Sequence, residues 1–247
     1  IMENIKIKDE NEPDTIIDGN ILLTYERKVI TNSSQVLAFE KGTWFDLDLR
    51  VLYRGGGMIT SAEKHITMRE IPNTVTNVID DLISDAIQRS ATQMKIRNIF
   101  APIIFSPRAF SAIFAFAFVP QIGKPEGATL HTRELHEDFS LVDDGTIPSL
   151  PNTTAFDDEG VMQSRTTIFS KGQFVTYINS CQTSELQEEQ TGNGFRVQMY
   201  ERFPRNYRAY PNVFPSNLII KEGKETIGEI MDDIAEGILV NSIQGYM

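Results

Sequence analysis

The sequence is poor in the residues that form disulfides, bind metals or bind nucleic acids. It has a single cysteine, Cys181, and three histidines among 247 residues. One cysteine excludes an internal disulfide and favours a reducing compartment, so we expect a cytoplasmic protein. The 23 lysines and arginines face 34 aspartates and glutamates, a formal net charge of −11. Because non-specific nucleic-acid affinity comes largely from phosphate neutralisation, this balance disfavours direct nucleic-acid binding.

Long apolar runs are also missing. The longest apolar stretch, Ala109 to Val119, is shorter than the roughly 20 residues of a membrane-spanning helix. No signal-peptide pattern opens the chain, so we expect a protein with no membrane segment. The 40% hydrophobic and 23% charged fractions are ordinary for a globular protein, with one large domain or two smaller ones.

The first third of the sequence has the patterns of a strand-rich segment. Residues 1 to 20 are polar and acidic, which predicts an extended or weakly ordered lead-in. Leu22 to Ile30 is rich in β-forming residues, and Phe45 to Tyr53 alternates between apolar and polar residues. The glycines at 55 to 57 predict a hairpin turn, with a strand returning from Met58 to Met68.

Three helices are predicted. Apolar residues at helical spacing from Val75 to Ile87 indicate a helix from about Pro72 to Met94. A short buried strand, Phe100 to Phe105, precedes an N-cap signal at Ser106-Pro107. The helix that follows is apolar nearly all round, so we expect it to be buried on several sides, in a core or against another subunit. Thr226 and Glu229 form a capping box for the last helix, expected to reach Leu239.

The order of these elements predicts an α+β fold. Residues from Leu130 to Asn217 are again strand-like, so strands and helices come in blocks rather than in strict alternation. We expect a strand-rich segment with its helix over residues 1–98 and a C-terminal α+β domain over residues 99–247.

Two polar segments are the main site candidates. Asp157, Asp158 and Glu159 repel one another, so the chain must turn them towards water, hydrogen-bond donors or a partner. A solvated corner and a cleft lip that offers carboxylates to a peptide amine or to basic side chains are both open. Asn193 lies in a glycine-rich turn, and Arg196 after it is a candidate to pair with this corner or to hold a peptide carbonyl.

Metal and thiol sites are not favoured by the histidines and the cysteine. His131, Glu134 and His136 come close to a zinc pattern, but a separation of five positions places the two histidines on different faces of a helix or strand. His65 has no ligand nearby in the sequence and is expected to be structural. Cys181 has no nearby histidine, so a buried, inert thiol is expected.

Three sequence stretches together resemble the C-terminal half of the TldD/PmbA family. They are Phe156-Asp157-Asp158-Glu159-Gly160, Arg165-Thr166-Thr167-Ile168-Phe169 and Thr191-Gly192-Asn193-Gly194-Phe195-Arg196. The last is similar to the family's Thr-Gly-Asn-Gly-Arg turn, with Phe195 inserted before the arginine. Members of the family act in peptide maturation and were named modulators of DNA gyrase.

The resemblance makes the helix after Ser106 decisive. Catalytic members carry His-Glu-x-x-x-His there, whose histidines hold a metal while the glutamate acts as base. Here the helix reads Pro107 to Phe116 without a pair of ligands one turn apart. The cysteine ligand of those members would lie beyond Met247, and the chain is expected to be a fragment or a short relative. It therefore resembles the PmbA (TldE-like) partner branch.

The resemblance implies a non-catalytic or regulatory subunit of a TldD/PmbA-type metallopeptidase complex. It implies a homodimer or a heterodimer with a TldD-like subunit, a peptide substrate, and zinc only in that partner. A binding or scaffold module without a role in proteolysis is the alternative, and a metallopeptidase in its own right ranks last. The residues expected at the substrate cleft or partner surface are Asp157, Asp158, Glu159, Arg165, Asn193 and Arg196.

Overall fold

The computed structural model describes residues 15–33, 35–55, 58–71, 75–91, 100–123, 129–183, 189–197 and 208–243. The chain divides into two compact units. Unit 1 comprises Ile1–Lys28, Phe39–Arg97 and Pro148–Pro151, and unit 2 comprises Val29–Ala38, Asn98–Ile147 and Asn152–Met247. Sheets and a few helices occur in both, in agreement with the predicted α+β class.

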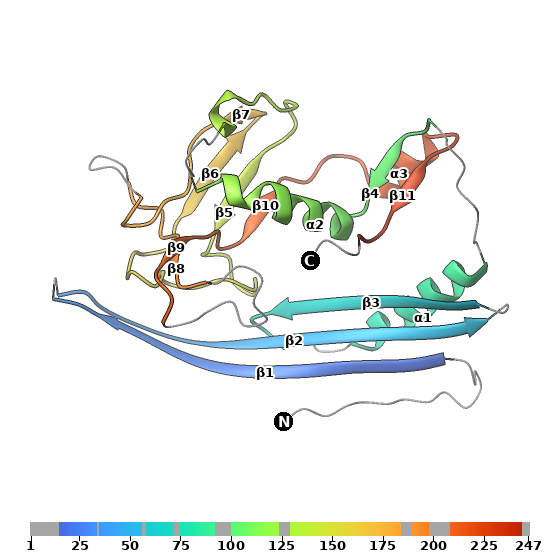
Figure 1. Cartoon of the computed structure of the whole chain (residues 1–247), viewed down its shortest axis with the longest axis horizontal. Helices are drawn as coiled ribbons and strands as arrows, with labels where there is room; N and C mark the ends of the chain where they lie inside the picture. The colour runs from blue at the N-terminus through green and yellow to red at the C-terminus, as the bar shows by residue number, and fades with distance from the viewer. Residues whose placement is uncertain are drawn as a thin grey trace. The chain divides into compact units, whose positions relative to one another are not determined.

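A three-stranded sheet dominates unit 1, in the order β1-β2-β3 (Figure 1). Its strands are β1 (Thr15–Thr31), β2 (Leu37–Gly55) and β3 (Met58–Met68). β2 and β3 pair antiparallel from Phe45↔Met68 to Gly55↔Met58, which confirms the predicted hairpin. β1 begins at Thr15, so the prediction of a weakly ordered lead-in was wrong for residues 15 to 20.

Helix α1 (Thr76–Ala91) packs against this sheet, as its apolar stripe predicts. The expected start signals at residues 72 to 74 and the end at Met94 lie outside the described residues. Thr60 Oγ1 donates to the Ala86 carbonyl at 2.7 Å and ties the helix to β3. Burial of each large apolar side chain stabilises the fold by about 1.5–3 kcal/mol. The buried cluster comprises Ile17, Val51, Ala62, Leu82 and Ala86.

Unit 2 holds shorter strands in three sheets. The largest has the order β10-β5-β6-β7, β8 pairs with β9, and β11 pairs parallel with β4. The strands are β4 (Ile103–Phe105), β5 (Leu141–Asp144), β6 (Arg165–Ser170), β7 (Gln173–Phe174), β8 (Gly194–Phe195), β9 (Asn212–Val213), β10 (Leu218–Ile220) and β11 (Ile238–Val240). The helices are α2 (Pro107–Ala117), η1 (Val119–Gln121), η2 (Leu130–Thr132) and α3 (Ile227–Asp232).

One side of α2 joins the core of unit 2. Phe114 and Phe118 stack at 4.6 Å between ring centroids, and Phe118 lies 5.9 Å from the buried Phe169. Such ring contacts add about 0.5–1.5 kcal/mol to the area that they bury. The core residues are Ile122, Leu130, Leu141, Ile168, Phe169 and Ile178.

The expectations for unit 2 held only in part. The described residues from Leu130 to Asn217 include the short strands β5 to β9, as expected for a strand-like segment, but they begin with a 3-10 turn, and many of their backbone groups bond in loops and turns. The last helix starts at the predicted Thr226–Glu229 capping box but ends at Asp232. Its expected end is strand β11 instead, because the β-branched pair Ile238 and Val240 aligns with β4.

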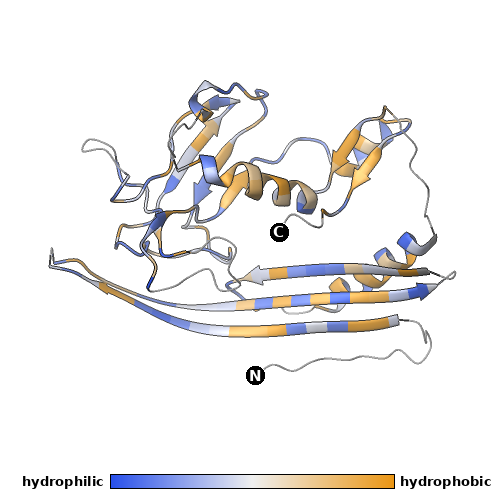
Figure 2. Cartoon of the chain, viewed as in Figure 1, coloured by the Kyte–Doolittle hydropathy of each residue, from blue (hydrophilic) through white to orange (hydrophobic). Residues whose placement is uncertain are grey.

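The prediction of a buried strand was also wrong, because Ile103 and Phe105 of β4 are exposed. In α2 only Ala109 is buried, so within the described part of this chain the helix is not buried on several sides. Burial of the helix against another subunit stays a prediction. Phe116 is 58% exposed, so the described residues leave much of this apolar helix uncovered (Figure 2). None of the helices that the structure describes has the length and apolarity needed to span a bilayer.

Candidate functional site

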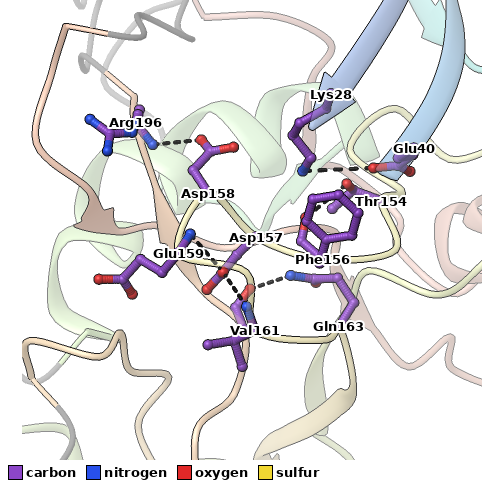
Figure 3. Close-up of polar contacts among 11 residues, drawn as sticks. Lys28, Glu40, Thr154, Phe156, Asp157, Asp158, Glu159, Val161, Gln163 and Arg196 are labelled. Atoms are coloured by element: carbon purple, nitrogen blue, oxygen red, sulfur yellow. Dashed lines mark hydrogen bonds and ion pairs between the residues drawn. The ribbon is translucent and has the colours of Figure 1, made fainter. Parts of the chain in front are cut away.

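The acidic corner is a buried hydrogen-bonded junction. Asp157 is fully buried, and its Oδ1 accepts the backbone N–H groups of Glu159 and Val161, each at 2.9 Å (Figure 3). Its Oδ2 accepts the N–H of Gly194, also at 2.9 Å. A carboxylate offers acceptors only, and three backbone donors satisfy this one. Asp157 therefore closes its own turn and fixes the turn before β8.

The two following acids extend the junction to other loops. Asp158 Oδ2 accepts the backbone N–H of Arg196 at 2.8 Å (Figure 3). The Asp158 N–H donates to Gly194 O at 3.0 Å. Glu159 Oε2 accepts the N–H of Cys181 at 2.8 Å. We call these three acids, with the backbone they bind, the acidic latch.

The latch explains why glycines occur in the facing turn. Gly192 has φ +75°, a left-handed conformation that favours glycine. A Cβ atom at Gly194 would overlap the Glu159 carboxylate. The turn prediction therefore accounts for Gly192, whereas close approach of an acid explains Gly194.

Burial sets the electrostatics of Asp157. Burial raises the pKa of its carboxyl, and the N–H groups of Gly194, Val161 and Glu159 oppose that rise. The prediction of a solvated corner is wrong for this residue. Contact of the corner with a peptide or a partner stays a prediction for the acids that keep exposed surface, Asp158 and Glu159.

Asn193 belongs to a second buried network, which the sequence did not indicate. Its Nδ2 donates to Asp143 Oδ2 at 2.6 Å and to Phe214 O at 3.1 Å. Ser216 Oγ donates to the same Asp143 oxygen at 3.0 Å. Burial raises the pKa of the Asp143 carboxyl, while these donors lower it. Asn193 is fully buried, so it holds the turn from inside.

The two candidate arginines keep exposed surface. Arg165 is exposed at the start of β6, where it lies opposite Asp144 in the antiparallel register with β5. The guanidinium of Arg196 donates from Nη1 to the Ala209 carbonyl at 2.6 Å, and its backbone N–H donates to Asp158 of the acidic corner at 2.8 Å. The structure thus brings Asp157, Asp158, Glu159 and Arg196 together, with Asn193 in the adjoining turn.

A pocket of about 530 Å³ lies beside α2. Its volume falls in the range of small-ligand sites, which are typically lined by apolar and aromatic side chains with few polar groups. Phe110 and Phe114, stacked at 5.8 Å, contribute from the helix, and Lys221 and Glu222 add charge. The remaining lining residues are Phe105, Pro107, Ser111, Ala115, Val119, Leu218, Ile220 and Ile227.

The histidines contact different groups. His131 Nδ1 lies 3.0 Å from the Tyr177 hydroxyl, whereas His136 Nδ1 lies 3.4 Å from Asp138. His65 Nδ1 lies 2.5 Å from Asp48, a partner that only the β2–β3 register supplies. We therefore interpret all three as hydrogen-bonded surface residues.

Cys181 is exposed, so the prediction of a buried thiol was wrong. Although the residue is exposed, partial desolvation of its sulfur and the neighbouring Glu159 charge raise the pKa of the Cys181 thiol to about 11. At neutral pH the group is a thiol, and the expectation of low reactivity has a physical reason.

The residues of α2 do not fit the zinc ion that the family resemblance implies for catalytic members. The helix contains no histidine, cysteine, aspartate or glutamate from Pro107 to Ala117. Across the described ranges, no group of three or more such residues is arranged to hold a metal. We therefore assign no step of a metal-dependent reaction to these side chains.

Comparison with known proteins identifies the relatives of the chain. Residues 100–247 match the PmbA/TldA metallopeptidase C-terminal domain. A metalloprotease from Synechocystis is 23% identical over 92% of this chain and 51% of its own length. A metalloprotease from Methanocaldococcus jannaschii is 33% identical over 44% of this chain and 22% of its own length. The chain spans about half the length of the relatives that it matches from end to end.

Solved structures share the fold. TldE from Thermococcus kodakarensis superposes with a TM-score of 0.78 at 22% identity, covering 96% of this chain and 54% of that one. A Thermotoga maritima protein described as a modulator of a DNA gyrase gives 0.67 at 17% identity, covering 94% and 51%. The family domain covers more than half of the sequence, and the chain therefore belongs to the PmbA/TldD metallopeptidase family.

Proposed function

We propose that the chain is a non-catalytic or regulatory subunit of a TldD/PmbA-type metallopeptidase complex that acts in peptide maturation. The observation that carries the proposal is the composition of α2. In the place where catalytic members present a metal-binding pair, this helix presents phenylalanines and alanines. The assembly would be a homodimer, or a heterodimer with a TldD-like subunit, in the cytoplasm. Zinc would belong to the TldD-like subunit.

The pocket beside α2 supports a role in holding peptide. Its stacked rings offer an apolar site for one side chain, and the charges of Lys221 and Glu222 lie at the same pocket. We propose that it receives an apolar side chain of the peptide substrate. Pocket residues in this role would lower the KM of the complex without taking part in bond cleavage.

The latch residues divide into two roles in this proposal. Asp157 and Asn193 are buried and hold the turns, so they would act on a ligand only through position. Asp158, Glu159, Arg165 and Arg196 keep exposed surface and are the proposed contacts for a peptide or for the partner subunit.

Reconstitution tests the proposal. The chain is mixed with a TldD-like partner, and cleavage of an apolar peptide is measured with and without a chelator. We expect no cleavage by the chain alone, no stoichiometric metal in it by elemental analysis, and chelator-sensitive cleavage that rises when both are present. Equal cleavage by the partner with and without the chain would instead support the scaffold alternative. Cleavage by the isolated chain, or one bound metal, would refute the proposal.

A pair of variants on α2 separates the pocket from the helix surface. Phe110→Asp places a charge in the pocket, whereas Phe116→Asp places the same charge on the exposed side, outside the pocket lining. We expect Phe110→Asp to raise the KM of the reconstituted complex at least tenfold, because a carboxylate in an apolar site opposes binding of an apolar group. Phe116→Asp should leave KM unchanged. Equal effects of both variants would rule out the pocket as the peptide site.

A further inference from the structure

The ribbon formed by β1 and β2 has a stretch without a third strand. β3 pairs with β2 only from Phe45 onward, so the part of β2 before Phe45 pairs with β1 alone (Figure 1). A two-stranded ribbon is only marginally stable in water without further packing. We define the arm face by the exposed, odd-numbered residues of unit 1 in this stretch and at its border with β3: Leu23, Tyr25, Arg27, Phe39, Lys41 and Thr43.

The arm face continues a face that is buried elsewhere in unit 1. Ile17 and Val51 also have odd numbers on β1 and β2, and they are buried in the cluster that includes residues of α1. In contrast, Leu23, Tyr25 and Phe39 are 58%, 56% and 56% exposed. Contiguous exposed apolar residues with a polar rim mark interaction surfaces more often than scattered ones do.

Both cations of the arm face lie against its aromatic rings. The Arg27 guanidinium carbon is 5.5 Å from the centre of the Tyr25 ring, and Arg27 Nε donates to the Tyr25 hydroxyl at 3.1 Å. Lys41 Nζ is 5.8 Å from the centre of the Phe39 ring. The side chains are thereby held on the surface of the ribbon as two aromatic–cation pairs.

The register of the ribbon sets these cations opposite each other. Asn32 N–H donates to Val36 O, and continuing the antiparallel ladder from that bond places Arg27 across from Lys41. Like charges directly opposite each other destabilise a sheet, typically by a fraction of a kcal/mol.

No carboxylate of the arm offsets that repulsion. Glu26 and Glu40 have even numbers and therefore belong to the opposite face, where Lys28 lies 3.6 Å from Glu40. In the parts of the chain that the structure describes, Arg27 and Lys41 make no ion pair. Arg27 and Lys41, two cations on one face of the ribbon without an ion pair among the described residues, provide a local site for an anionic partner on a chain of net charge −11.

We propose that the arm face docks an acidic polypeptide segment of another protein that carries both apolar and carboxylate side chains on one face of an extended chain. Such a segment, extended along the ribbon, would place its apolar side chains on Leu23, Tyr25 and Phe39. Its carboxylates would reach Arg27 and Lys41. Because successive side chains of an extended chain point to opposite faces, the residues that contact the arm face lie two apart in the segment, in the order apolar, acidic, apolar.

Charge argues against the other occupants. A second copy placed arm against arm would bring four cations together. A contact between the arm of one copy and a different surface of the next would not form a closed dimer. Anionic membranes attract clusters of about four to eight basic residues, whereas the arm face has two on an acidic chain. Nucleic acid also requires more phosphate neutralisation than two cations supply.

The test uses a fluorescent synthetic peptide in which every second residue is in turn leucine, glutamate and phenylalanine, with serine at the positions between them. Its binding to the full chain is followed by anisotropy at low and high salt. We expect saturable binding that salt weakens, and no binding of a matched peptide with lysine in place of glutamate. The variant Arg27→Glu/Lys41→Glu should weaken binding at least tenfold, because it replaces two positive charges at the contact by two negative ones that repel the glutamates of the peptide.

The control variant is Arg54→Glu/Lys64→Glu, which makes the same change of charge on exposed residues of the same sheet outside the arm. It should bind the peptide like the parent chain, and thermal melts should show that both variants fold. Equal loss in both variants would show a general charge effect and overturn the proposal. Preference for the lysine peptide, for phosphatidylserine vesicles or for self-association through the same residues would overturn it as well.

Discussion

Replacing Asp157 by asparagine tests the acidic latch with little change of shape. Asparagine keeps one oxygen and exchanges the other for an NH₂ group, which is a donor. The side chain at 157 faces three backbone donors, from Glu159 and Val161 at one oxygen and from Gly194 at the other. In either orientation of the amide, its NH₂ group therefore meets at least one N–H.

The expected cost follows from that geometry. The orientation that loses fewer hydrogen bonds keeps Glu159 and Val161 and leaves the Gly194 N–H without an acceptor. A buried donor without an acceptor costs about 1–3 kcal/mol. Each kcal/mol shifts Tm by about 2–4 °C in a chain of this size, so we expect Tm to fall by roughly 2–12 °C.

Thermal melts and amide hydrogen exchange measure the effect. The local result should be faster exchange of the Gly194 amide, with Leu82 and its neighbours in unit 1 unchanged. Asp143→Asn is the matched control, because that buried carboxylate accepts from Asn193 and Ser216 through one oxygen, which an amide retains. If Asp157→Asn melts with the parent and Gly194 stays protected, the latch does not stabilise this turn.

Three further predictions follow from individual contacts. Since burial raises the pKa of Asp143, its contribution to stability is present below the ordinary value of 3.8 and is lost as pH rises through the folded value. Denaturant titration at several pH values should therefore show that the free energy of unfolding of the parent falls relative to that of Asp143→Asn as pH rises through this window. A difference between the two proteins that does not change with pH would contradict this. Ser106→Ala removes the cap of α2, whose Oγ accepts the Ala109 N–H at 3.2 Å, and should cost about 1 kcal/mol, unlike Ser111→Ala on the helix surface. Cys181 should react with iodoacetamide about 10-fold more slowly than a thiol of ordinary pKa 9.0, because a pKa of about 11 leaves about 100-fold less thiolate while each thiolate attacks about 10-fold faster. Glu159→Gln should speed the reaction, and a rate like that of a free thiol would refute the assignment.

Local signals in the sequence predicted the elements whose hydrogen bonds are close in sequence. The hairpin after Gly55, the cap at Ser106 and the capping box at Thr226 each depend on residues within a few positions of one another. Where long-range pairing decided the structure, the same reasoning failed. Residues 238 to 240 continue a helical pattern, but pairing with β4, more than 130 residues earlier, makes them a strand.

The contacts of the acidic latch could be predicted only in part from the sequence. Mutual repulsion of Asp157, Asp158 and Glu159 predicted that they must find water, donors or a partner, and they find donors. The sequence could not show that these donors are backbone N–H groups of Gly194, Arg196 and Cys181, since N–H groups are common to nearly all residues. The Asp143–Asn193 pair was missed for a related reason, because 50 residues separate its members.

The division between buried and exposed latch residues bears on the proposed function. The Asp157 carboxylate and the Asn193 Nδ2 group make buried hydrogen bonds that hold the turns, whereas Arg196 is anchored by its backbone and extends its guanidinium to the Ala209 carbonyl. A ligand would thus meet side chains whose backbone positions are fixed before it binds, which lowers the entropy cost of association. Loss of the latch should therefore lower stability and peptide affinity together, whereas loss of the Arg196 guanidinium alone should lower affinity more than stability. That difference separates a residue that positions the site from one that contacts the ligand.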